Sequence, residues 1–219
     1  MHIPDGLMAP VVWALGWVLA IIFVAIAVKR VNKKFDERMV PFMAILAAGI
    51  FVAQMLNFPI VGGTTGHLIG AALATILLGP WAAILILTVI LIIQGFIFGD
   101  GGITALGLNI LNMAVIGSVS AYLVIKVVPK KHELLGIFLA GWVSVFLAST
   151  ACALELASSF AIDPAFGIEG SVAIPAMMIS HAIIGVGEGI ITAGVVAFLA
   201  KVAPETMSMR NSWKKEALV

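Results

Sequence analysis

The sequence predicts an all-α integral membrane protein with seven transmembrane helices. Of its 219 residues, 62% are hydrophobic, and the mean hydropathy is +1.18. Soluble domains contain roughly 45–50% apolar residues, so this chain is far too apolar for one. Several apolar stretches approach the ~20 residues that a bilayer-spanning helix needs. All Lys and Arg residues fall in a few short segments between those stretches, as is typical of a multi-pass topology.

The expected spans are 11–28, 40–56, 67–78, 81–98, 104–125, 134–158 and 173–200. The first ends where the basic segment 29–39 begins, and the second contains the small-residue run Ala47-Ala48-Gly49. The third is short. Gly79-Pro80 separates it from the fourth, because proline disfavours a helix in the residue before it. Six spans is therefore the main alternative.

The last three spans follow the same logic. Asn109 and Asn112 are three residues apart in the fifth span and share one helical face. The sixth begins after the basic segment 126–133, and the seventh carries a run of glycines from Gly185 to Gly194. Small residues let helices approach closely in lipid, so we expect a compact bundle with a tightly packed last helix. Residues 1–200 form one expected domain, and 201–219 form a cytoplasmic tail.

Charge placement predicts the orientation. With the amino terminus outside, the cytoplasmic pieces are 29–39, 79–80, 126–133 and 201–219, and they hold all twelve basic residues. The outer pieces carry Asp5, Asp100, Asp163 and Glu169 and no basic residue. The net charge of +1 conceals this asymmetry and gives no sign of a nucleic-acid partner.

The chain starts Met1-His2-Ile3-Pro4-Asp5-Gly6, with no Lys or Arg before the first apolar stretch. A cleavable signal peptide would need such a basic region, so we expect the segment to be retained. We also expect Met1 to be retained, because His2 is not a small residue.

An amino terminus followed directly by histidine can chelate one metal ion. The Met1 α-amine, the deprotonated main-chain nitrogen of His2 and the His2 Nδ1 atom close fused five- and six-membered rings around it. One position of a square plane stays open, and all-nitrogen square-planar coordination favours Ni(II) or Cu(II). Protons compete with the metal for these nitrogens, so binding is expected to weaken below about pH 6.

His67 is the expected fourth ligand. It follows the small-residue stretch 62–66 at the outer mouth of the third span, where a neutral imidazole can complete the plane. The alternative is a helix-start residue that hydrogen-bonds a loop carbonyl. His132 lies in a basic cytoplasmic segment and receives no role.

Polar groups within apolar spans are costly and usually face a polar interior. We expect hydrogen bonds from such groups to hold the ligands and pack the bundle. The expected supporting residues are Asp5, Gln94, Asp100, Asn109, Asn112, His181 and Glu188. Cys152 has no cysteine partner and is expected to be a buried, inert thiol. The ten methionines lack a repeated spacing and are expected to fill gaps rather than bind copper.

Four segments in order, MHIPDG, HLIGAALATILLGPWAA, IQGFIFGDGGITALGLNILNM and HAIIGVGEGIIT, resemble the CbiM/NikM family, most closely its nickel (NikM) branch. Members are substrate-binding membrane subunits of energy-coupling-factor transporters for cobalt and nickel. The resemblance runs from Met1 to about residue 200. It implies a six-helix core plus an extra amino-terminal helix, in a prokaryotic cell membrane.

The resemblance also implies the ligand set Met1, His2 and His67, with Ni(II) as the transported substrate and Co(II) as the alternative. The implied partners are a membrane coupling subunit, a pair of ATP-binding-cassette ATPases and a small accessory membrane subunit of NikN/CbiN type. The chain itself contains no P-loop, as expected if partners hydrolyse ATP.

Two functions of other classes compete with this reading. An intramembrane metalloenzyme would use His181, Glu188 and Asp100, but the chain has no His-Glu-x-x-His run. A self-sufficient ion-coupled carrier would commonly show paired repeats and charged midplane sites. This chain has no repeat and no Lys or Arg within its expected spans.

Overall fold

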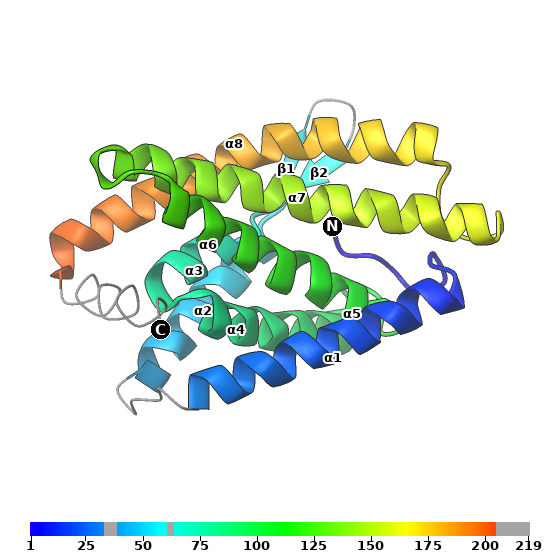
Figure 1. The fold of residues 1–219 in the computed structure, drawn as a ribbon, viewed down its shortest axis with the longest axis horizontal. Helices are drawn as coiled ribbons and strands as arrows, with labels where there is room; N and C mark the ends of the chain where they lie inside the picture. Colours follow the sequence, from blue (N-terminus) through cyan, green and yellow to red (C-terminus); the bar gives the residue numbers. More distant parts are fainter. Residues whose placement is uncertain (33–38, 61–63, 205–219) are drawn as a thin grey trace.

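The computed structural model describes residues 1–32, 39–60 and 64–204, and these form a helical bundle with one small hairpin (Figure 1). The α-helices are α1 (Pro10–Asn32), α2 (Met39–Met55), α3 (Ala71–Leu78), α4 (Pro80–Ile93), α5 (Leu106–Asn109), α6 (Gly117–Val127), α7 (Glu133–Ile162) and α8 (Gly170–Val202). The π-helical turns η1 (Gln94–Phe98) and η2 (Ile110–Ile116) continue α4 and α5, and a short 3₁₀ turn, η3 (Lys130–His132), precedes α7.

A multi-pass helical membrane protein is confirmed. Within the described ranges, five helical stretches are long and apolar enough to cross a bilayer: Pro10–Asn32, Pro80–Phe98, Leu106–Val127, Lys130–Ile162 and Gly170–Val202. The helix α2 has 17 residues and is shorter than these. Residues 33–38 and 205–219 lie outside the described residues, and with them most of the predicted tail.

Seven full crossings are not confirmed, because the expected third span 67–78 is only partly helical. The helix α3 has eight residues, which rise only ~12 Å against a hydrocarbon core of ~30 Å. Gly70 and Gly79 flank it with φ angles of 75° and 82°, a left-handed backbone that ends helices on both sides. Pro80 then starts α4 at a position that needs no N–H donor.

The segment before α3 forms a two-stranded hairpin that the sequence did not predict. Strands β1 (Phe58–Ile60) and β2 (Thr64–Gly66) pair antiparallel, with Phe58 opposite Gly66. The hairpin leads into residues 67–70, which run as a loop toward the centre of the bundle (Figure 1). This loop carries His67 and is named the site loop below.

The helices α7 and α8 run side by side along one face of the molecule (Figure 1). Glycines allow that approach: a Cβ atom on Gly141 would lie 2.8 Å from the Cα of Gly189. The Trp142 indole also donates to the carbonyl of Ala182 at 3.0 Å. These contacts confirm the expected close packing of the last helix.

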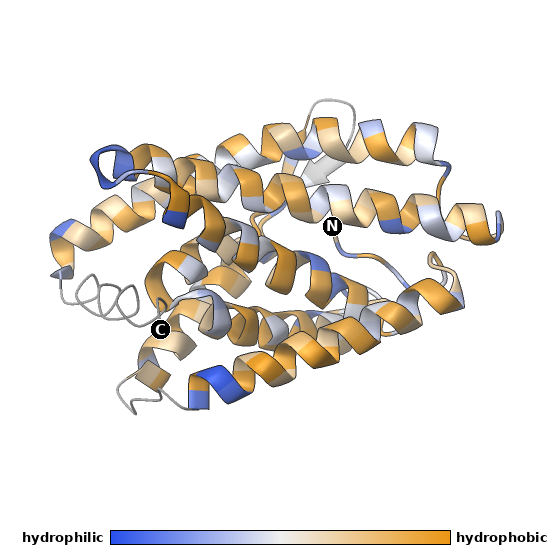
Figure 2. Cartoon of the chain, viewed as in Figure 1, coloured by the Kyte–Doolittle hydropathy of each residue, from blue (hydrophilic) through white to orange (hydrophobic). Residues whose placement is uncertain are grey.

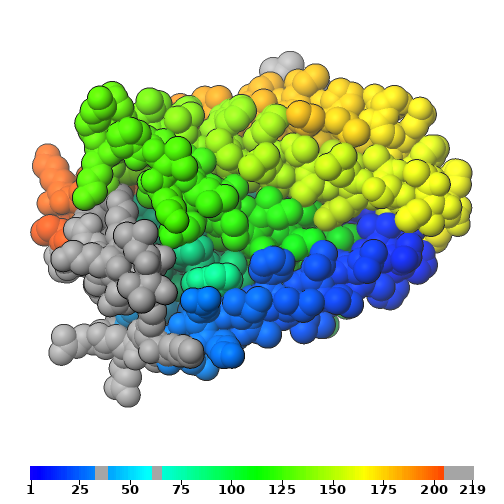
Figure 3. Space-filling view, in the orientation of Figure 1, coloured from blue at the N-terminus to red at the C-terminus, as the bar shows by residue number. Residues whose placement is uncertain are grey.

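The described basic residues gather at one end of the bundle. Figure 2 shows hydrophilic residues where α1 ends, at the turn between α6 and α7, and where α8 ends. The turn between α7 and α8 lies at the opposite end. There the start of the chain packs against it, and the Gly167 N–H donates to the Leu7 carbonyl at 2.6 Å (Figure 3).

Candidate metal centre

A cavity of about 260 Å³ lies inside the bundle at the start of the chain. Met1, His2 and Ile3 form one side of it, and His67 with Ile69 of the site loop forms another. Helices α7 and α8 close the remaining side. The structure therefore brings the three expected ligand residues to one cavity.

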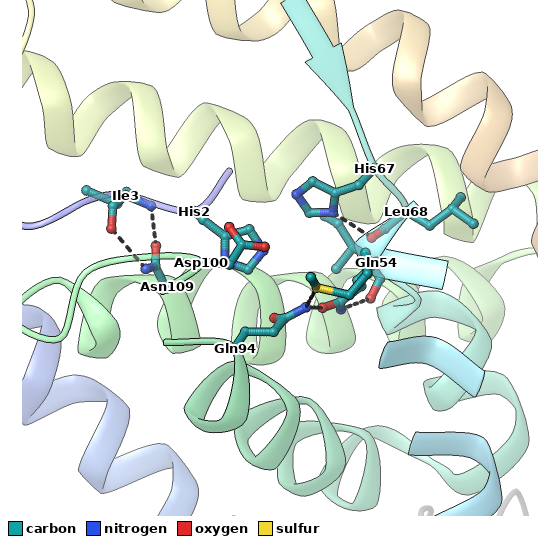
Figure 4. A network of polar contacts seen from close by, with 10 residues as sticks. His2, Ile3, Gln54, His67, Leu68, Gln94, Asp100 and Asn109 are labelled. Atoms are coloured by element: carbon teal, nitrogen blue, oxygen red, sulfur yellow. Dashed lines mark hydrogen bonds and ion pairs between the residues drawn. The ribbon is translucent and has the colours of Figure 1, made fainter. Parts of the chain in front are cut away.

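The main chain of Ile3 is held by Asn109 at the end of α5. The Ile3 N–H donates to Asn109 Oδ1 at 2.8 Å, and Asn109 Nδ2 donates back to the Ile3 carbonyl at 3.2 Å (Figure 4). The N–H of Gly102 donates to the same carbonyl at 2.8 Å. A buried amide side chain thus pairs both polar groups of the residue that follows His2.

Asp5 also holds the start of the chain through hydrogen bonds. Its carboxylate accepts the N–H groups of Ile103 at 3.0 Å and Thr104 at 2.7 Å, as well as the Thr104 hydroxyl at 2.5 Å. These hydrogen bonds to the charged form hold the pKa of Asp5 below its ordinary value, with the Thr104 side chain contributing most. Asp5 is one of the expected supporting residues, and its hydrogen bonds are to the loop 99–105.

His2 points into the centre of the bundle with its side chain 8% exposed. Among the described residues, neither ring nitrogen has a hydrogen-bond partner. Its ring lies 5.0 Å from the His67 ring, centroid to centroid, and its Nε2 lies 3.8 Å from Asp100 Oδ2 (Figure 4). Buried polar atoms normally have partners, and His2 lines the cavity, so its unpaired ring nitrogens favour a ligand at this place.

The hydrogen bond of His67 determines which of its nitrogens is free. His67 Nδ1 lies 2.8 Å from the Leu68 carbonyl oxygen, which can only accept, so Nδ1 carries the proton. Nε2 then keeps its lone pair for a metal. The sequence allowed two interpretations of His67: a residue that hydrogen-bonds a loop carbonyl, or a metal ligand. The two are compatible because the first uses Nδ1 and the second would use Nε2.

Two side chains from distant helices hold the site loop. The Glu188 carboxyl group in α8 accepts the N–H groups of Ile69 and Gly70, each at 2.7 Å. Gln54 in α2 donates to the Ile69 carbonyl at 2.6 Å and accepts from Gln94 Nε2 at 2.8 Å (Figure 4). Of the expected supporting residues, Glu188 bonds the backbone of the site loop directly, whereas Gln94 bonds Gln54, which in turn bonds the loop.

The site favours neutral nitrogens. Burial, followed by the nearby amino-terminal charge, lowers the pKa of His2 and of His67 to about 3. Burial also lowers the pKa of the Met1 α-amine below 8.0. Protonated forms are disfavoured, so the lone pairs of both imidazoles are available at neutral pH.

Within residues 1–32, 39–60 and 64–204, no three His, Cys, Asp or Glu side chains are grouped to hold an ion.

Asn112 and His181, two further expected residues, bond groups other than the three ligand candidates. Asn112 Nδ2 donates to Glu155 Oε2 at 2.7 Å, which pairs η2 with α7. His181 lines the same cavity as Met1, His2 and His67, and its Nδ1 lies 2.8 Å from the Met177 carbonyl.

The sequence analysis overlooked Gln54. Its side chain is 1% exposed and bridges the site loop to Gln94. The available signal was an amide inside the otherwise apolar stretch MVPFMAILAAGIFVAQM, where an unpaired polar group would be costly.

Fold and site together define a helical membrane protein that encloses nitrogen donors at the start of its chain. Residues 2–206 match the family model for CbiM, described as the cobalt uptake substrate-specific transmembrane region. The chain belongs to this family, which confirms the resemblance seen in the sequence.

Named relatives and solved structures agree with this assignment. A putative fused nickel transport protein NikMN of Archaeoglobus fulgidus is 39% identical over 100% of this chain and 72% of its own length. A cobalt transport protein CbiM of Sorangium cellulosum is 29% identical over 94% of each chain. A crystal structure of a transition metal transporter superimposes with a TM-score of 0.85 at 39% identity, covering 98% of this chain and 99% of the other.

Proposed function

We propose that this chain is the substrate-binding subunit of an energy-coupling-factor transporter and captures Ni(II) from outside the cell. The ligands are the Met1 α-amine, the His2 main-chain nitrogen, the His2 Nδ1 atom and the His67 Nε2 atom. The observation that carries the proposal is the convergence of the buried chain start and His67 on one cavity. Hydrogen bonds from Asn109, Asp5 and Glu188 support that arrangement.

Ni(II) is preferred to Co(II) for two reasons. Four nitrogens in a plane suit Ni(II), and Ni(II) lies above Co(II) in the affinity order of divalent ions. The listed relatives named for nickel are 35–39% identical to this chain, whereas those named for cobalt are 29–32% identical. Asp100 lies near His2 and helps to attract a cation.

ATP hydrolysis and movement of the complex are assigned to partners. The chain contains no P-loop, so the proposal includes a membrane coupling subunit and separate ATP-binding-cassette ATPases. The fused NikMN relatives favour a small accessory subunit of NikN type. The proposed location is a prokaryotic cell membrane with seven crossings, α3 being a shortened one, and with the amino terminus outside.

The decisive experiment blocks the α-amine. A chain with six Gly and Ser residues added before Met1 is expected to lose at least 100-fold in Ni(II) affinity, about 2.7 kcal/mol. The reason is that the amine becomes an amide within a longer peptide. Calorimetry compares this form with protein that starts at Met1 and carries its tag at the carboxyl end, using Ni(II), Co(II) and Zn(II).

The length of the extension matters for this test. A single added residue would place the histidine third, where the new amine, two amides and the imidazole form a square plane of their own. Retention of Ni(II) affinity within threefold by the six-residue extension would overturn the proposed ligand set. Stronger binding of Co(II) than Ni(II) by the unextended protein would overturn the nickel preference.

A further inference from the structure

The carboxylate of Asp100 lies beside the His2 ring. Its Oδ2 atom is 3.8 Å from His2 Nε2, and the Asp100 side chain is 36% exposed, whereas that of His2 is 8% exposed. An N–H···O hydrogen bond spans about 2.7–3.2 Å, so the two groups are in contact but not bonded. Attraction of a cation does not need such a contact, because charge acts over a Debye length of about 8 Å at physiological ionic strength. The contact therefore indicates a more specific role for this carboxylate.

The backbone of the loop 99–105 places the carboxylate at the ring. The Asp100 N–H donates to the Gln94 carbonyl of η1 at 3.0 Å. The next residue, Gly101, has a φ angle of 95°, a left-handed backbone that other residues rarely adopt. A Cβ atom on Gly101 would lie 3.3 Å from His2 Nδ1. Glycine therefore lets the loop approach the ring closely and keeps a side chain away from Nδ1.

The chelate geometry determines which nitrogen of His2 needs an acceptor. The chelate ring that includes the His2 main-chain nitrogen reaches Nδ1, so with the metal there Nε2 carries the ring proton. Among the described residues, neither ring nitrogen has a hydrogen-bond partner, and a buried N–H without an acceptor is unfavourable. Histidines that bind metals usually donate their other N–H to a carboxylate or a carbonyl, which fixes the tautomer and the ring orientation.

We propose that Asp100 is the positioning residue of the metal site: its carboxylate accepts the Nε2–H of His2 when Ni(II) occupies Nδ1. This inference rests on the proposed function. The distance between Nε2 and Oδ2 then shortens by about 1 Å, to that of a charge-assisted hydrogen bond. The carboxylate also offsets the positive charge that Ni(II) keeps after the His2 amide loses its proton. Asp100 therefore slows the release of the bound ion.

The main-chain carbonyl of Asp100 is the competing acceptor. Burial and the amino-terminal charge lower the pKa of His2, whereas this carbonyl raises it, so the carbonyl also lies near the ring. Substitution of the Asp100 side chain leaves the carbonyl in place. Variants at this position therefore test the carboxylate alone.

The test measures how fast Ni(II) leaves protein that starts at Met1 when excess EDTA is added. Asp100→Leu removes the charge and the acceptor, whereas Asp100→Asn removes the charge and keeps an acceptor oxygen. We expect dissociation at least tenfold faster in Asp100→Leu than in the native protein, and at least threefold slower in Asp100→Asn than in Asp100→Leu. Attraction alone would slow association equally in both variants and leave dissociation unchanged. Asp163→Asn, at an exposed aspartate between α7 and α8, is the matched control and should release nickel at the native rate.

Two kinetic results would overturn the positioning role: a native dissociation rate in Asp100→Leu, or equal rates in Asp100→Leu and Asp100→Asn. A nickel-bound crystal structure of the native protein decides the question if Asp100→Leu does not fold. There the distance from His2 Nε2 to Asp100 Oδ2 is expected to be about 2.7–3.2 Å, and a distance that stays at 3.8 Å would refute the proposal. The same structure separates the two claims, because an ion away from His2 Nδ1 would contradict the proposed function itself.

Discussion

In the proposed site, the ring of His67 serves both structure and metal binding. Its Nδ1 fastens the ring to the Leu68 carbonyl, and this bond leaves Nε2 free. The ring orientation is therefore set before a metal arrives, so less ordering is required on binding. His2 differs, because its ring nitrogens have no such partner among the described residues.

Replacing His67 tests the fourth ligand. His67→Gln is expected to weaken Ni(II) binding at least 100-fold, because the amide nitrogen offers no lone pair in place of Nε2. Calorimetry on the folded variant measures the loss. His132→Gln, at an exposed histidine in the turn η3, is the matched control and should bind as the native protein does. Equal affinities of the two variants would remove His67 from the site.

The number of protons that the protein releases when it binds nickel reports the protonation state of the empty site. With ordinary pKa values, the amine, the two imidazoles and the His2 amide would together release between about three and four protons at pH 6. Burial lowers the pKa of both imidazoles to about 3, so they are already neutral at pH 6 and release none. We expect between one and two protons per nickel, from the amide and the fraction of amine still protonated.

Calorimetry in buffers of different ionisation enthalpy counts these protons. Because burial lowers the pKa of both histidines, protons compete with nickel for the imidazoles only at low pH. The imidazoles therefore oppose nickel binding only as the pH approaches 3. Ordinary histidine pKa values would lower the nickel affinity steeply below about pH 6. With the lowered pKa values, only the amide and the amine make binding depend on pH there, and this dependence is smaller. A count of three or more would show that the rings are protonated in the empty site.

At the scale of elements, the proposed site depends on two loops between helices, the site loop 67–70 and the loop 99–105. The loop 99–105 receives the chain start, and the backbone there approaches closely. A Cβ atom on Gly102 would lie 2.2 Å from the Asp5 nitrogen and 2.6 Å from the Pro4 carbonyl carbon. Glycine is required at this position because no side chain fits between the two segments.

Gly102→Ala is therefore expected to displace the segment 1–5 and reduce Ni(II) affinity at least tenfold, while the helices persist. The added methyl group collides with backbone atoms that cannot rotate away. Calorimetry measures the affinity, and circular dichroism verifies the helix content. Gly49→Ala in α2 is the control, since its Cβ would meet no atom within 4 Å. Native affinity in Gly102→Ala would disprove the docking role.

Sequence patterns predicted the long helices well because composition and length decide them. The span 134–158 corresponds to α7 and the span 173–200 to α8, each longer than expected. The expected span 67–78 is helical only over Ala71–Leu78, because an apolar run does not reveal where backbone hydrogen bonds go. The hairpin of β1 and β2 was not predicted, because short strands surrounded by apolar helices leave little periodic signal.

The residues that gather at the site were partly predictable. Met1 and His2 are adjacent, so their chelating chemistry is visible in the sequence. Glu188 bonds Ile69 and Gly70 of the site loop, which lie 119 and 118 positions earlier in the chain. No local pattern reveals such contacts. Asn112 shares a helical face with Asn109, and its side chain pairs with Glu155 on α7, 43 positions later, which no local pattern reveals.

For the whole molecule, the described basic residues at one end of the bundle predict its direction in the membrane. Starting from Cys152→Ser, we introduce Lys131→Cys or Ala165→Cys, at exposed turns on opposite ends. An impermeant maleimide added to right-side-out vesicles is expected to label the Ala165→Cys form and to reach the Lys131→Cys form only after permeabilisation. The reverse pattern would invert the proposed topology.

The long reach of the first residues has a consequence for biosynthesis. Ile3 bonds a residue 106 positions later, and the Ala9 N–H donates to Ser159 Oγ, 150 positions later, at 3.3 Å. Contacts of such high sequence separation form late. The ribosome must therefore finish most of the protein before the first three residues can dock, so truncated nascent chains do not assemble the proposed metal site.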